Sequence, residues 1–170
     1  MIENQFDEIV DRYSQPIWSI IFKMVHHKET AYDLTQDVFT KVWEHRNKFD
    51  HQKQIFTYIY KIAMNLSIDY LRKKKPDIIE TELLELINSS DPDDQDELFN
   101  LIVQCSSDLK PKQKAVFLLR DIEGFTYKEI AETLKMSVNN IQSDLHLARK
   151  KIRHLLESKY QLTLETLYDM

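Results

Sequence analysis

Side chains that could bind DNA gather on one face of residues 138–156. Amides and hydroxyls stand at the start of this face and positive charges at its end: Asn139, Asn140, Gln142, Ser143, His146, Arg149, Lys150, Lys151 and Arg153. Amide side chains pair with base edges in the major groove, and Lys and Arg contact phosphates. The pattern indicates a DNA-binding helix, although an ordinary helix with a solvated charged face would show a similar one.

The elements around this face follow a helix-turn-helix pattern. Thr126 is placed to cap a short helix, Lys135 begins a tight turn, and Ser137 is placed to cap a longer helix. Apolar residues every three or four positions predict the buried stripe of the longer helix: Val138, Ile141, Leu145, Ala148, Ile152 and Leu155. Gly124, the only glycine of the chain, suits the end of the preceding helix, which opens at Lys110. This arrangement is typical of DNA-binding motifs.

The composition favours an all-α fold. Of 170 residues, 42% are apolar and 30% are charged, and one Gly and four Pro leave few places for hairpin turns. The single Cys105 excludes an internal disulfide and is expected to be buried and inert. No secretory signal and no apolar run long enough to span a membrane occur, so we expect a cytoplasmic protein without membrane insertion.

The charges divide the chain into three parts. Residues 1–75 carry 12 Lys or Arg against ten Asp or Glu, residues 76–100 carry none against nine, and residues 101–170 carry 11 against nine. All the net acidity of −5 therefore comes from the central part. We predict two small helical domains joined by an acidic linker, bounded as 1–76, 77–95 and 96–158, with a tail at 159–170.

Patterns typical of catalysis do not occur in the sequence. It has no glycine-rich phosphate loop, no nucleophile beside a base and no cluster of metal ligands. Asp33 and Asp37 lie on one side of a helix but lack the organised cleft of a catalytic pair, so a solvated or partner-binding face is favoured. We therefore expect no enzyme, no cofactor, no metal and no small-molecule substrate.

Three helices are predicted in the first domain, over 3–25, 30–46 and 55–75. Pro16 interrupts the first one, which predicts a kink or two abutting helices. His26 and His27 follow it and are expected on the surface, because no partner with metal-ligand spacing lies nearby. Thr30 and Asp33 resemble a capping box for the second helix.

The third helix combines aromatic rings with positive charges. Phe56, Tyr58 and Tyr60 crowd its start, Asn65 lies further along, and four cations at 72–75 close it. Cations suit the negative end of a helix dipole. Rings, amides and cations together also suit single-stranded DNA, because bases stack on rings and phosphates meet cations. The residues alone leave both interpretations open.

Taken together, three blocks resemble a bacterial RNA polymerase sigma factor of the small, two-domain extracytoplasmic-function type. The core-polymerase-binding helix of that family is similar to AYDLTQDVFTKVWE (31–44), and its −10 promoter block is similar to FTYIYKIAMNLSIDYLRKKK (56–75). Its −35-binding domain is similar to residues 109–156. Each block is moderately specific, and the three in this order around an acidic linker are strongly specific.

The resemblance implies three groups of site residues. The first would dock on the clamp of core RNA polymerase: Asp33, Gln36, Asp37 and Phe39. The second would bind −10 DNA: Phe56, Tyr58, Asn65, Arg72, Lys73, Lys74 and Lys75. The third would bind −35 DNA: Asn139, Asn140, Gln142, Ser143, His146, Arg149 and Lys150. Trp43 matches the first group too, but its place on the apolar stripe favours a core position.

The implied function is a promoter-specificity subunit that binds core polymerase, reads −35 and −10 elements and captures melted −10 DNA. Its implied partners are core polymerase, promoter DNA and an anti-sigma factor, which in the family is often anchored in the membrane. The alternative is a stand-alone helix-turn-helix regulator that binds duplex DNA without polymerase.

Some positions depart from the family pattern. Gln142, Asp144 and Leu147 stand where basic residues are common, so we expect weak or altered −35 binding. Lys135 replaces a Gly often seen in the turn, so we expect a left-handed backbone at a residue with a side chain.

Overall fold

The structure is a computed structural model that describes residues 3–48, 52–73 and 94–161. Its first half comprises α1 (Glu3–Val25), α2 (Lys28–Glu44), the 3₁₀ turn η1 (Arg46–Lys48) and α3 (Gln52–Lys73). Its second half comprises α5 (Asp94–Cys105), the 3₁₀ turn η2 (Ser106–Asp108), α6 (Pro111–Phe117), the π turn η3 (Leu118–Ile122), α7 (Tyr127–Leu134) and α8 (Val138–Tyr160). The all-α prediction is confirmed. Within these ranges, no helix combines the length and apolar character that a membrane span requires.

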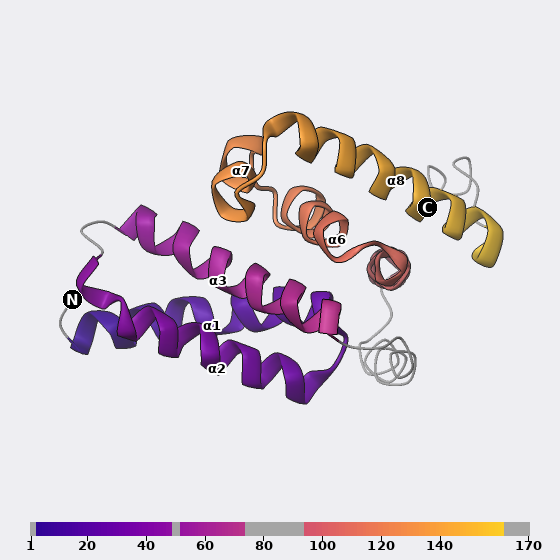
Figure 1. The fold of residues 1–170 in the computed structure, drawn as a ribbon. Coiled ribbons are helices and arrows are strands. Elements are labelled where there is room, and N and C mark those ends of the chain that lie inside the picture. Colours follow the sequence, from indigo (N-terminus) through magenta and orange to yellow (C-terminus); the bar gives the residue numbers. More distant parts are fainter. Residues whose placement is uncertain (1–2, 49–51, 74–93, 162–170) are drawn as a thin grey trace.

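In the first half, α1, α2 and α3 pack together as a bundle (Figure 1). Ile17, Ile20, Ile21 and Met24 recur at helical spacing along α1 and are fully buried. Pro16 lies inside α1 without ending it, so the alternative of two abutting helices is wrong. A proline inside a helix costs about 3 kcal/mol. Pro16 is exposed, and burial of the four apolar side chains that follow it stabilises the continued helix.

The turn between α1 and α2 corrects two predictions. His26 is 2% exposed and adopts φ 53°, so it is a buried residue rather than a surface histidine. His27 caps α2, because its Nδ1 accepts the backbone N–H of Thr30 at 3.2 Å. The predicted capping box at Thr30 and Asp33 is therefore wrong. The imidazole ring does what a Ser or Asp side chain usually does, and α2 begins at Lys28.

In the second half, α6 contacts α8 and passes directly into the wider turn η3. The backbone N–H of Glu123 donates to the carbonyl of Leu118 at 3.0 Å, a π-type hydrogen bond five residues back. Leu118 and Leu119 are both fully buried there. Gly124 follows with φ 75°, as predicted for a helix end, and Cys105 is buried, also as predicted.

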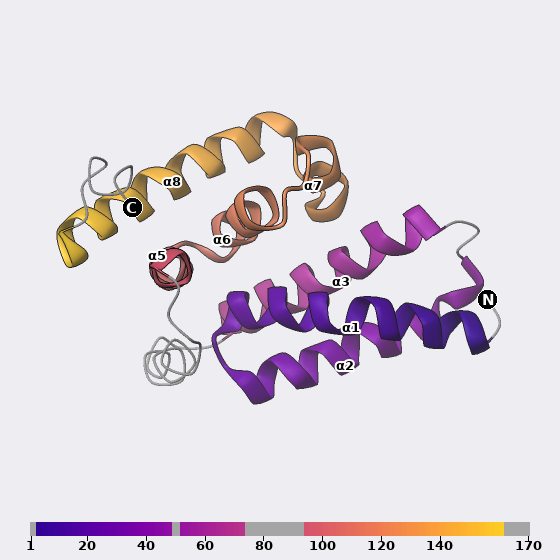
Figure 2. The same ribbon diagram turned by 180° about the vertical axis from the view of Figure 1, so that it is seen from behind.

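The two halves pack against one another, with α3 lying along α6 and α7 (Figures 1 and 2). Their buried apolar residues form one continuous cluster. At its edge the ring of Phe125, just before α7, stacks on Phe56 with centroids 5.4 Å apart and lies 4.9 Å from Tyr60. The predicted linker falls outside the described residues except for its last two, which begin α5.

Candidate functional site

The helix-turn-helix is built by the local signals that predicted it. The side chain of Thr126 accepts the N–H of Glu129 at 3.2 Å, and the Glu129 carboxylate accepts the N–H of Thr126 at 2.8 Å. This reciprocal capping box starts α7. The hydroxyl of Ser137 accepts the N–H of Asn140 at 3.2 Å and starts α8. Between them, Lys135 adopts φ 51°, which confirms the expected left-handed residue at a cost of about 1 kcal/mol.

The long helix α8 presents the predicted polar face to solvent. Its buried side is formed by Ile141, Leu145, Ala148, Ile152 and Leu156. All seven predicted −35 residues are exposed: Asn139, Asn140, Gln142, Ser143, His146, Arg149 and Lys150. Val138 was expected on the buried stripe but is 40% exposed, because it is the first residue of the helix and lies beyond the covered part. Leu147 is 51% exposed and adds an apolar group to the polar face.

One residue of that face already has a partner inside the protein. Arg149 donates two hydrogen bonds to Asp121 of η3, from Nε at 2.8 Å and from Nη2 at 2.6 Å. This bidentate bond raises the pKa of Arg149. Nothing in the local pattern signals the pair, because the two residues lie 28 positions apart. Arg149 therefore ties α8 to η3, and its charge is already largely balanced.

The predicted −10 residues differ in their exposure. Asn65, Arg72 and Lys73 are exposed, whereas Phe56 is half-buried against Phe125. Tyr58 lies on another side, with its ring centroid 6.0 Å from that of His45; burial and the nearby charge of Glu44 raise its pKa. Lys74 and Lys75 lie outside the described residues. Part of this face is thus open and part is covered by the second half.

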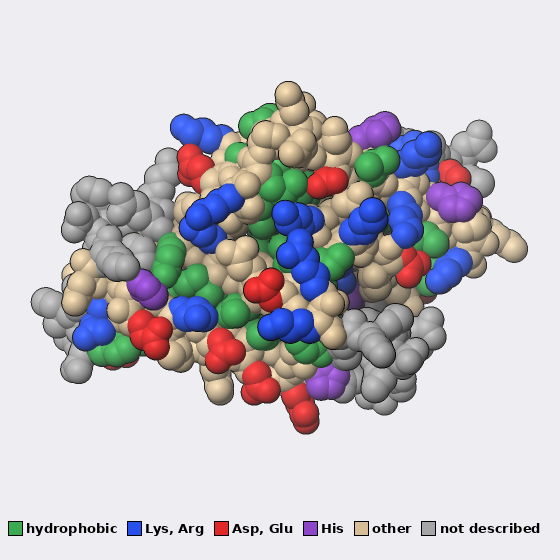
Figure 3. Space-filling view, in the orientation of Figure 1, with side chains coloured by type: hydrophobic (Ala, Val, Ile, Leu, Met, Phe, Trp, Pro, Cys, Tyr) green, Lys and Arg blue, Asp and Glu red, His purple; other side chains and the backbone are tan. Residues whose placement is uncertain are grey.

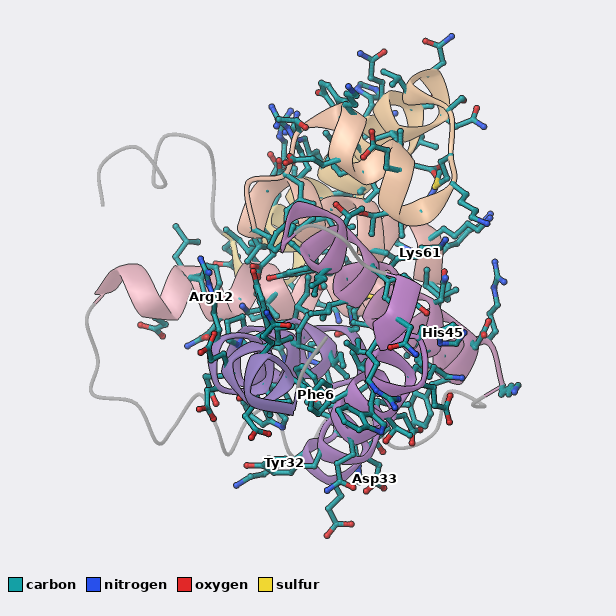
Figure 4. All side chains as sticks on the ribbon, turned by 90° about the vertical axis from the view of Figure 1, so that its left-hand side faces the viewer. Phe6, Arg12, Tyr32, Asp33, His45 and Lys61 are labelled. Atoms are coloured by element: carbon teal, nitrogen blue, oxygen red, sulfur yellow. The ribbon has the colours of Figure 1, made fainter. Side chains whose placement is uncertain are left out.

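Positive charges meet where α3 faces the second half. Lys61 lies on that side of α3 (Figure 4), near the turn residue Lys135. Burial and the charge of Lys135 both lower the pKa of Lys61. The repulsion between these two like charges weakens this edge of the contact. The rings of Phe56, Tyr60 and Phe125 contribute attraction nearby, since each such ring pair is worth about 0.5–1.5 kcal/mol beyond its buried area.

The predicted polymerase-binding residues lie on α2, away from the second half. Asp33 is labelled at that outer position in Figure 4, and Asp33, Gln36 and Asp37 are all exposed. Figure 3 shows Asp and Glu side chains gathered along this edge of the molecule, with Lys and Arg above them. Phe39 is only 8% exposed, so it supports the surface from below.

An open groove of about 850 Å³ lies beside these carboxylates, between α1 and α2. Phe6, Phe39 and Trp43 supply its apolar lining, and Gln36 and Thr40 supply polar groups. Phe6 and Trp43 meet edge to face with centroids 4.9 Å apart, and Arg46 covers the Trp43 ring at 4.0 Å. The partly buried Trp43 therefore forms the wall of the groove. An apolar groove rimmed by carboxylates and amides suits a basic, partly apolar protein surface.

In the described part of the chain, no group of three or more His, Cys, Asp or Glu side chains is placed to hold a metal ion. The arrangement offers three separate surfaces, on α2, α3 and α8, rather than one enclosed site. Each carries exposed polar or charged side chains, and the rings of Phe39 and Phe56 lie partly or wholly beneath them.

Comparison with known families matches both halves. The family described as Sigma-70 region 2 matches residues 9–76, and the family described as Sigma-70, region 4 matches residues 99–152. Curated relatives match almost end to end. The chain is 31% identical to the ECF RNA polymerase sigma factor SigW of Bacillus subtilis (strain 168) over 168 residues, which is 91% of this chain and 90% of that protein. It is 26% identical to the ECF RNA polymerase sigma-E factor of Escherichia coli (strain K12), covering 88% and 85%.

Two solved structures share the fold. The sigma factor RpoE in complex with the anti-sigma factor NepR from Bartonella quintana superposes with a TM-score of 0.70 at 18% identity, covering 91% of this chain and 98% of that one. CnrH in complex with the cytosolic domain of CnrY gives a TM-score of 0.70 at 20% identity, covering 92% and 90%.

Proposed function

The chain belongs to the extracytoplasmic-function group of the sigma-70 family of RNA polymerase sigma factors, and from this premise we propose which surface binds core polymerase and which bind promoter DNA. It is a promoter-specificity subunit that binds core RNA polymerase and directs transcription initiation. The observation that carries this conclusion is the near end-to-end match to SigW, together with the match of both sigma-70 regions in order along this chain. A stand-alone regulator would account for the second half alone.

The proposed surface for core polymerase is the outer face of α2. Asp33, Gln36 and Asp37 provide exposed acceptors, and the groove over Phe39 provides apolar area beside them. A basic protein surface with an apolar centre would gain from both features. We assign the clamp of core polymerase to this face.

The proposed DNA surfaces are α3 for the −10 element and α8 for the −35 element. The amides of Asn139 and Asn140 begin the exposed face of α8, and Lys150 ends it, so bases and phosphates would be met in that order. On α3, Asn65, Arg72 and Lys73 are exposed and suit melted DNA and its backbone. An anti-sigma factor is the further partner that we propose, since the matched RpoE structure is a sigma factor in complex with the anti-sigma factor NepR.

The direct test is reconstituted transcription with bacterial core enzyme and a pool of promoter sequences. We expect initiation from a subset of sequences that share a −35 and a −10 element. Loss of all initiation when core enzyme is omitted separates this function from independent duplex binding, which a gel shift with the free chain would detect. A chain that neither binds core enzyme nor selects any promoter would refute the proposal.

The α2 assignment makes a prediction of its own. Reversing Asp33→Lys and Asp37→Lys together is expected to weaken core binding by about tenfold or more, because close charge pairs across an interface strengthen binding. The matched control reverses Glu29→Lys and Glu44→Lys, which are also exposed on α2. Circular dichroism should show unchanged helix content in both variants. Equal core affinity of the first variant and wild type, measured by fluorescence anisotropy, would remove Asp33 and Asp37 from the interface.

A further inference from the structure

The contact between the halves includes a cap on α1 that comes from α6. Lys114 is only 2% exposed, and its Nζ donates to the carbonyl of Met24 at 2.7 Å, across 90 residues of sequence. Met24 lies in the last turn of α1, where carbonyls lack hydrogen-bond partners within the helix. A side chain of the second half therefore satisfies the end of a helix in the first.

The residue after α1 takes part in the same contact. The Nε2 atom of His26 lies 3.0 Å from the hydroxyl of Ser107 on η2. Its other ring nitrogen, Nδ1, is buried and has no hydrogen-bond partner among the described residues. A neutral ring fits this site, because one of its nitrogens carries no hydrogen. A charged ring would place an N–H where no acceptor is available, which is unfavourable.

The charges around these two groups do not neutralise them. Lys23 of α1 pairs with Glu123 after η3 at 3.6 Å, and Lys151 of α8 donates to the backbone carbonyl of Asp108 on η2. The charge of Asp108 on η2 favours the protonated form of Lys114, but burial of Lys114 outweighs it. None of the ion pairs within the described residues includes Lys114 or His26.

We propose that Met24, His26, Ser107 and Lys114 form a clasp between the halves that opens by taking up protons, and that its opening uncovers Phe56 and Tyr60 for melted DNA. The first part of the proposal concerns the chain alone. The second part rests on the proposed function, because it assigns these rings to promoter DNA. In the clasped arrangement Phe125 occupies the rings, so a base cannot stack on them at the same time.

Burial sets the direction of the proton effect. It lowers the pKa of Lys114 to about 7, against the opposing charge of Asp108. Burial, with the Lys114 charge added, lowers the pKa of His26 well below 6.5. When the halves part, both groups return to water and to their ordinary pKa values, about 10.4 for Lys and 6.5 for His. Opening therefore takes up a proton at Lys114 between about pH 7 and 10, and at His26 below about pH 6.5.

The expected result is a clasp that tightens as pH rises. Between about pH 7 and 10, the ratio of open to closed molecules should fall by up to about tenfold per pH unit, the limit for one proton. Spin labels on Lys41→Cys of α2 and Glu132→Cys of α7, both exposed, would report the two distances in a full-length Cys105→Ala background. Double electron–electron resonance should show a growing long-distance population as pH falls from 9.5 to 5.5. Distances that do not change over this range would overturn the proposal.

Single substitutions distinguish proton uptake at Lys114 from proton uptake at His26. Lys114→Gln keeps a donor for Met24 but cannot titrate, so the alkaline part of the response should vanish. His26→Asn suits the left-handed backbone and should abolish only the acid part. Lys112→Gln on the exposed side of α6 is the matched control and should leave both parts intact. An alkaline response that persists in Lys114→Gln would refute the role of Lys114, and Ser107→Ala offers a milder test of the His26 contact.

The clasp and the proposed function fail in different ways. If the labels separate at low pH in a chain that directs no transcription, the proposed function and the second part of the proposal are both wrong. The clasp itself would still stand. Transcription by a chain whose labels stay together at every pH would overturn both parts of the clasp proposal and leave the proposed function standing.

Discussion

The two helices assigned to promoter DNA, α3 and α8, stand in opposite situations. The polar face of α8 is fully open, and the contacts that shape it lie within its own half, in the capped turn and the Arg149–Asp121 pair. The ring-bearing start of α3 is covered by Phe125 from the other half. Duplex DNA could dock on α8 as it stands, whereas capture of a base by the rings on α3 requires the halves to move. Reading the duplex and capturing melted DNA thus make different demands on one fold.

Removing the Phe125 ring, which covers the start of α3, should have the largest effect. Phe125→Ala deletes a side chain that is 5% exposed, and such deletions cost about 3–5 kcal/mol of unfolding free energy. Urea unfolding followed by circular dichroism measures the loss. The control is Phe99→Ala, because Phe99 is 38% exposed and should cost far less. Equal, small losses in the two variants would show that Phe125 does not cover α3 in solution and that the two helices are equally open.

Removing the cations at the end of α3 should have the second largest effect. Replacing Arg72, Lys73, Lys74 and Lys75 together by Ala should reduce promoter opening by about tenfold or more at moderate salt. The slope of log binding against log salt should fall by about 0.7–0.9 per lost phosphate contact. Replacing four cations of other surfaces, Lys28, Lys41, Lys110 and Lys112, is the control. Unchanged opening would show that these cations serve only the helix dipole.

The smallest effect concerns the ion pair between Arg149 on α8 and Asp121 on η3. Arg149→Met and Asp121→Asn should each lower the unfolding free energy by about 0.5–1 kcal/mol, because the pair is bidentate but Arg149 is half exposed to solvent. A double-mutant cycle should show that the two losses do not add. If Arg149 instead serves only DNA, the losses will add, and Asp121→Asn will strengthen −35 binding. The open face of α8 would then depend less on its own half than the structure indicates.

Local signals predicted much of this fold. The caps at Thr126 and Ser137, the left-handed residue Lys135 and the glycine at the end of η3 were each visible in the sequence, because a cap or turn involves residues only a few positions apart. The polar face of α8 was visible for the same reason. Helical periodicity shows which side of a helix is buried.

Contacts between the halves were not visible. Lysine is usually a surface residue, and the neighbouring Lys112 is exposed. Lys114 is nevertheless buried, because it binds the carbonyl of Met24, 90 residues away in the sequence. His26 was misjudged for the same reason, since Ser107 lies 81 residues away. Periodicity shows that a side is covered but not by what. The assignment of α2, α3 and α8 to polymerase and DNA came from family resemblance and remains a proposal.

The wide turn η3 has a consequence for which length changes the protein tolerates. A π turn arises when a helix accommodates one extra residue. Deleting one residue there would rotate every side chain before it by about 100° relative to those after it. Asp121 would then point away from Arg149, and Leu118 or Leu119 would leave the core. Variants of this protein that gain or lose single residues should therefore be rare between 118 and 122 and common in surface loops.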